Sequence, residues 1–159
     1  MPPARVVSFT LRAAAGLAAG DRTVTVKVAD PNGVEATTTV VARVLPPDFA
    51  PSVTPSNLVL NAGGAAGTIA AFLTPGSCPP STDVTITPSG LPPGVVVTPT
   101  SALVSPPDFG PALFSFLAGA GAEPGPSTIT FTWAPNGATP QTTTATISVC
   151  GAPAAPGSP

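Results

Sequence analysis

Residues 128–133 read Thr-Ile-Thr-Phe-Thr-Trp, a strict alternation of polar and apolar side chains. Successive side chains of a β-strand point to opposite faces, so the isoleucine, phenylalanine and tryptophan share one face and the threonines share the other. Residues 143–149 alternate in the same way, and a Pro-Asn-Gly turn at 135–137 lies between the two segments. The Asn-Gly pair is a strong hairpin signal. This stretch therefore predicts an antiparallel hairpin with one buried face.

The same pattern occurs earlier in the chain. Residues 23–28 read Thr-Val-Thr-Val-Lys-Val, and a Pro-Asn-Gly turn follows at 31–33. Phe9 through Leu45 aligns with Phe114 through Cys150, an offset of about 105 residues, with one extra residue in the turn of the first copy. This offset is the size of one small β-sandwich. The chain is predicted to hold two copies of one repeat, the first of them partial.

The composition indicates an all-β fold. The chain has 159 residues, including 24 prolines and 16 glycines, and only 8% of its residues are charged. The hydrophobic fraction of 43% is too high for a disordered chain. Abundant Thr, Val, Pro and Gly favour strands joined by tight turns over helices.

Seven strands are predicted for the complete copy, with the spacing of an immunoglobulin-like antiparallel β-sandwich. They lie at 52–60, 66–74, 83–88, 94–98, 112–118, 126–133 and 141–149. The partial copy is predicted to hold only the last three strands, at 5–12, 22–29 and 36–45. The predicted domains are a partial unit over 1–46, a complete sandwich over 47–150 and a Pro-rich tail or linker over 151–159.

The complete copy resembles the bacterial immunoglobulin-like repeats found in tandem on secreted and cell-surface proteins and on phage virions. The most distinctive piece is Gly-Leu-Pro-Pro-Gly-Val at 90–95. The other matching pieces are Asp-Phe at 48–49, Val-Thr-Pro-Ser at 53–56, Gly-Gly at 63–64, Val-Thr-Ile at 84–86 and Pro-Gly-Pro at 124–126. The resemblance implies a non-catalytic spacer, adhesion or decoration module outside the cell. Cys150 and the loop around Cys78 depart from the usual repeat.

Several function classes are not expected. The chain has no His and no Tyr, and most enzymes and metal sites draw on His as base or ligand. We expect no enzyme activity, no cofactor and no metal. All bases precede residue 44, so the rest of the chain lacks the basic face that nucleic-acid binding requires. No signal peptide and no apolar run long enough to cross a bilayer are present.

The two cysteines, Cys78 and Cys150, are expected at opposite poles of the sandwich. A disulfide requires Cα atoms within about 7 Å. Three alternatives stay open at this stage: a bridge within the domain, a head-to-tail bridge between copies, and free thiols.

Three further motifs are interpreted as structural. The acids are too isolated for a Ca²⁺ cage. Pro-Pro-Asp-Phe occurs at 46–49 and at 106–109; we expect its Asp to bond its own turn and its Phe to plug an edge of the sandwich. Trp133 is expected in the core rather than as a sugar-binding platform.

We expect a structural or interaction module that spaces, decorates or adheres on a virion, filament or bacterial cell, through contacts between protein subunits. The alternative is a carbohydrate- or receptor-binding accessory domain of a secreted bacterial protein. The partial copy lacks the strands that cover its apolar face, so the predicted interaction face comprises Phe9, Leu11, Val24, Val26 and Val28. Whether Met1 is the native start stays open.

Overall fold

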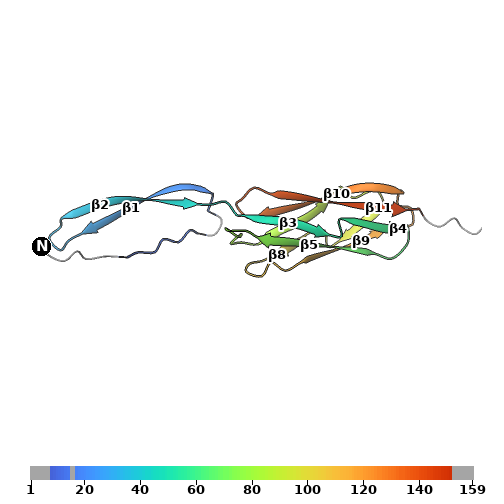
Figure 1. Cartoon of the computed structure of the whole chain (residues 1–159), viewed down its shortest axis with the longest axis horizontal. Helices are drawn as coiled ribbons and strands as arrows, with labels where there is room; N and C mark the ends of the chain where they lie inside the picture. Colours follow the sequence, from blue (N-terminus) through green and yellow to red (C-terminus); the bar gives the residue numbers. More distant parts are fainter. Residues whose placement is uncertain (1–7, 15–16, 152–159) are drawn as a thin grey trace, which may run out of the picture.

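Two β-sheets pack face to face over residues 49–150, and a separate two-stranded sheet precedes them along the chain (Figure 1). The computed structural model describes residues 8–14 and 17–151. All regular structure in this part of the chain is β-strand. The all-β, immunoglobulin-like sandwich predicted from the sequence is confirmed.

The strands pair as follows. The four-stranded sheet has the order β3 (Phe49–Thr54), β5 (Gly67–Pro75), β9 (Ala112–Ala118) and β7 (Val95–Thr98). The five-stranded sheet has the order β4 (Asn57–Asn61), β11 (Gln141–Cys150), β10 (Gly125–Pro135), β6 (Val84–Ser89) and β8 (Ala102–Val104). The two-stranded sheet consists of β1 (Gly20–Ala29) and β2 (Glu35–Val44). Neighbouring strands are antiparallel except β4 and β11, which are parallel.

The core lies between the two stacked sheets. Phe131 of β10 packs edge-on against Phe114 and Phe116 of β9, with ring centroids 5.6 and 6.4 Å apart. Trp133, on the same face of β10, is also fully buried, as the alternation at 128–133 predicts. The threonines of this stretch lie on the opposite, solvent-facing side of the five-stranded sheet.

Most predicted strands of the sandwich lie within two residues of the observed ones. The predicted strand at 52–60 is instead two strands, because the chain leaves β3 at Thr54 and joins the other sheet as β4 at Asn57. Just past Pro55, the carbonyl of Ser56 accepts from the amide of Thr146 in β11, so the chain is bonded there to the five-stranded sheet. The short strand β8 was not predicted; three residues are too few for an alternation to be visible.

The predicted strand at 5–12 is wrong over its described part, since residues 8–12 form no strand; residues 5–7 lie outside the described residues. In the repeat, residues 8–14 correspond to β9, which pairs with β5 on one edge and β7 on the other. No equivalent of either strand accompanies residues 8–14 in the described part of the chain. Without a neighbouring strand, this backbone has no ladder to join.

Two glycines fix the turn that carries the Gly-Leu-Pro-Pro-Gly-Val motif. Gly90 and Gly94 have φ angles of +77° and +79°, in the left-handed region that side chains with a Cβ rarely adopt. A Cβ on Gly94 would also come within 2.7 Å of the Ala122 backbone. The second glycine is therefore required both by conformation and by space.

Replacing Phe131 by Ala is expected to lower the free energy of unfolding by about 3–5 kcal/mol, because the deletion leaves a cavity between the two sheets. Thr128→Ala, on the exposed face of the same strand, is the matched control and is expected to change stability by about 0.5 kcal/mol or less. Urea unfolding followed by tryptophan fluorescence measures both. Equal effects would contradict the assignment of the two faces.

Gly94→Ala is expected to destabilise the sandwich by at least about 1–2 kcal/mol, because the left-handed backbone disfavours a Cβ and the added methyl meets Ala122. Gly121→Ala is the control, since open space surrounds that position. Thermal unfolding monitored by circular dichroism compares the two variants. A Gly94→Ala protein as stable as the control would show that the turn relaxes freely.

Candidate interaction groove

The hairpin β1–β2 has the same backbone pairing as the hairpin β10–β11 of the complete sandwich. Gly20 pairs with Val44 in the first hairpin, and Gly125 pairs with Val149 in the second. Each residue of the second pair lies 105 positions after its equivalent in the first. The two glycines also share their conformation, with φ angles of 137° and 134°. The structure thus places the same hairpin twice in one chain, once inside a sandwich and once outside it.

The inner face of β1–β2 lacks the cover that its equivalent has. Phe131 and Trp133 are fully buried. Val26, the equivalent of Phe131 in the first hairpin, is half-buried, and Val28, the equivalent of Trp133, is 54% exposed. Phe9 and Leu11 are 53% and 47% exposed, and their equivalents Phe114 and Phe116 are fully buried. The apolar side chains are present at the repeat positions, but residues 8–14 and 17–48 provide no opposing strands.

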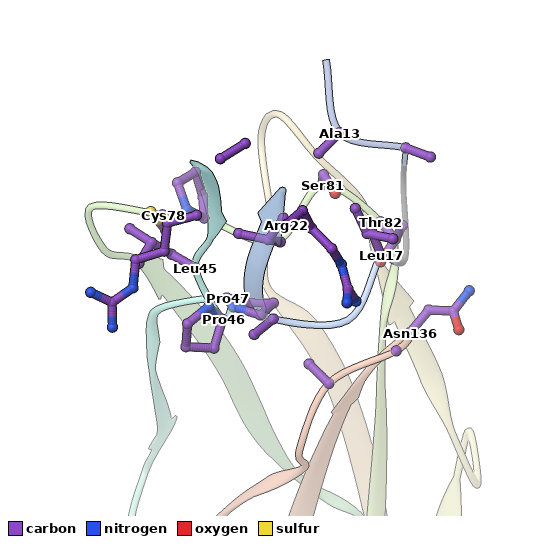
Figure 2. Close-up of a pocket in the computed structure, with 18 of the residues that line it drawn as sticks. Ala13, Leu17, Arg22, Leu45, Pro46, Pro47, Cys78, Ser81, Thr82 and Asn136 are labelled. Carbon is purple, nitrogen blue, oxygen red and sulfur yellow. The ribbon is translucent and has the colours of Figure 1, made fainter. Parts of the chain in front are cut away.

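A groove of about 1050 Å³ occupies the space between this hairpin, the segment before it and the near pole of the sandwich. Its apolar wall is formed by Leu11, Leu17, Val24, Ala42 and Val44. The opposite wall comes from the sandwich loops at 78–82 and 136–140 (Figure 2). The groove lies at the junction between the hairpin and the sandwich. Of the predicted interaction face, Leu11 and Val24 line the groove; Phe9, Val26 and Val28 do not.

Three arginines, Arg12, Arg22 and Arg43, line the groove, and no acidic residue does. Arg43 lies at its rim, because it also pairs with Asp21 on the outer face of the hairpin. Figure 2 shows Arg22 reaching into the middle of the groove; its Nη2 donates to the carbonyl of Ala18 at 3.4 Å. These arginines were not predicted as a site from the sequence. They become a cluster only through the packing of the hairpin against the pole, which no local pattern reveals. The groove therefore combines apolar walls with donors suited to carbonyl or carboxylate oxygens.

The outer face of the hairpin is polar and carries two ion pairs. Lys27 Nζ lies 2.6 Å from Glu35 Oε2, and Arg43 Nε lies 3.7 Å from Asp21 Oδ1. Both pairs join β1 to β2 on the side away from the apolar face. The hairpin is therefore amphipathic, with a solvated side and a side built for contact.

Cys78 and Cys150 lie at opposite poles of the sandwich, and neither forms a disulfide within the chain. The carbonyl of Cys78 accepts from the amide of Asp48 where β3 begins, and the carbonyl of Cys150 accepts from Ala62 just after β4. The extended chain between those two points spans on the order of 40 Å. A bridge within the domain is therefore excluded, since it requires Cα atoms within about 7 Å.

The remaining motifs have structural positions. Phe49 and Phe109 of the two Pro-Pro-Asp-Phe motifs are buried in the core. The Asp48 carboxylate accepts from the amide of Ser77 at 3.2 Å, so the expectation that it bonds its own turn is wrong: it ties β3 to the loop after β5. Trp133 is buried, as expected.

Residues 8–14 and 17–151 hold no group of three or more His, Cys, Asp or Glu side chains arranged to bind a metal ion. No helix in this part of the chain has the length and apolarity needed to cross a membrane.

No family model and no curated protein matches the chain. Among solved structures, PapD-like domain 7 of human CEP192 has a TM-score of 0.53 at 14% identity, covering 70% of this chain and 92% of that one. The periplasmic chaperone SfaE has a TM-score of 0.50 at 10% identity, and the match covers 64% of this chain and 57% of the SfaE chain. The E. coli chaperone DraB has a TM-score of 0.49 at 12% identity, with coverages of 65% and 55%. The chain spans just over half of either chaperone, and identities this low show the fold alone.

The amides of β1–β2 are expected to exchange with solvent much faster than those of β10–β11 in the purified monomer, although the two hairpins pair in the same register. A two-stranded sheet with an uncovered apolar face opens readily, whereas the hairpin of the sandwich opens only with the core. Hydrogen exchange by mass spectrometry provides the internal comparison. Equal protection in a dilute monomer would show that β1–β2 needs no cover.

Proposed function

We propose that this chain is a non-catalytic structural and interaction module, an immunoglobulin-like repeat of the tandem bacterial and phage type. It spaces, decorates or adheres on the outer surface of a virion, filament or bacterial cell through contacts between protein subunits. The open groove beside β1–β2 supports this proposal most directly. A largely apolar groove of this size, next to edges of β1 and β2 that pair with no other strand of the described residues, is a surface on which another polypeptide can pack or add a strand.

The distribution of charge is in keeping with a protein partner. The acids Asp48, Asp83, Asp108 and Glu123 are scattered over the sandwich, and its solvent-facing strand β11 alternates threonine and serine with the core residues. Such a surface offers neither the basic patch of a nucleic-acid binder nor an aromatic platform for sugar rings. The burial of Trp133 removes the single tryptophan from the surface.

Immunogold electron microscopy with antibodies against residues 48–151 tests the proposed location. We expect labelling of the outside of intact cells, filaments or virions from the source organism. Labelling confined to the interior of sectioned cells would contradict the proposal. Selective binding of the purified chain to one glycan class on an array would instead favour the carbohydrate-binding alternative.

A further inference from the structure

The outer edge of β2 is free and oriented for pairing. Within the described residues, β2 pairs only with β1. In the turn, the amide of Asp30 donates to the carbonyl of Val34. The backbone N–H and C=O groups of the even-numbered residues of β2 therefore point towards β1, and those of the odd-numbered residues point towards the free edge. The complete repeat agrees: Thr146, at the position equivalent to Val41, donates outward to the carbonyl of Ser56.

We infer that β2 pairs antiparallel with β2 of a second copy of this chain, with Thr39 on the two-fold axis. This inference deepens the proposed function by naming the partner and the strand edge, and it rests on that proposal only for its biological setting. The pairing joins two hairpins into one four-stranded sheet. Three or more strands with an apolar face are the minimum for a stable sheet in water.

Charge complementarity selects this register. When Thr39 of one copy lies opposite Thr39 of the other, each residue four positions before it lies opposite the residue four positions after it in the second copy. Glu35 of each copy is therefore opposite Arg43 of the other. Shifting the axis by one residue or more separates these charges. Thr37 then lies opposite Val41, whose side chain is 63% exposed in the single chain; such a β-branched pair stabilises adjacent strands.

The new pairs extend the ion pairs that the hairpin already has. Lys27 contacts Glu35 and Asp21 contacts Arg43 within each chain. Across the four strands of the proposed dimer, the order would be Lys27 on β1 and Glu35 on β2 of one copy, then Arg43 on β2 and Asp21 on β1 of the other. Charges of alternating sign would therefore cross all four strands on the polar face. Such a network is stronger than an isolated surface pair.

The edge of β1 offers a weaker alternative. Pairing about Val24 would also set Asp21 opposite Lys27 of a second copy, but the inner face of β1 carries Arg22. That pairing would bring two guanidinium groups onto the apolar face near the axis. The inner face of β2 carries no charged side chain; its members are Ala36, Thr38, Val40, Ala42 and Val44. Antiparallel pairing of β2 also places the two sandwiches at opposite ends of the sheet, because each sandwich follows the C-terminal end of its own β2.

Sedimentation equilibrium of the full chain and two charge-reversal variants tests the pairing. The unaltered chain is expected to dimerise, more weakly as salt rises from about 50 to 500 mM. Glu35→Lys alone and Arg43→Glu alone each set like charges opposite one another twice and are expected to raise the dissociation constant by about tenfold or more. An equal mixture of the two variants restores opposite charges at both contacts and is expected to form heterodimers.

Glu123→Lys is the matched control: it is the same charge reversal as Glu35→Lys, but Glu123 is exposed in the loop before β10, at the pole of the sandwich that holds Cys150, so the dissociation constant is expected to stay within about twofold. Thr39→Pro removes an amide at the free edge and is expected to abolish dimerisation while the thermal unfolding of the sandwich stays unchanged. A chain that stays monomeric at millimolar concentration, or a mixture that fails to associate, would overturn the inference. Loss of dimerisation with Glu123→Lys would also overturn it, because net charge and not the register of β2 would then govern association. None of these outcomes bears on the surface location tested by immunogold.

Discussion

The buried face of a sheet must be covered, and in this protein the cover for β10–β11 is the aromatic pair on β9. Phe131 packs edge-on between Phe114 and Phe116, and this contact joins the two layers of the sandwich. The ladders to β6 and β4 can hold only because that interface keeps water away from one side of the sheet. The position of every loop at the poles follows from the alignment of these two layers.

The chain contains a natural comparison that separates local from long-range causes. Two hairpins share their register, the backbone of their leading glycines and a Pro-Asn-Gly turn, so these features arise from local sequence. They differ in burial, because only one of them has strands across from it. Local sequence is sufficient to shape a hairpin, whereas tertiary partners decide whether its apolar face becomes a core or a surface.

Much of the fold could be predicted because strand alternation and turn chemistry are local. The stretch at 128–133 identified the buried face of β10, and the repeat located the hairpin at its first occurrence. The failures have long-range causes. Residues 8–12 carry strand-forming side chains but lack the neighbours that β9 has in the sandwich. The arginines of the groove come together only when the hairpin meets the loops at the pole. The division of the predicted strand at 52–60 into β3 and β4 depends on pairing with β11, a strand far away in the sequence.

The parallel pairing of β4 with β11 gives the sandwich a mechanical property. The chain enters at the pole where β3 begins and leaves at the opposite pole after Cys150. A pulling force applied between these two points acts along β4 and β11 in opposite directions. The hydrogen bonds between these strands lie across that direction, so they share the load in shear instead of opening one after another as in a zipper. A module with this connectivity transmits tension along its long axis before its core is disturbed.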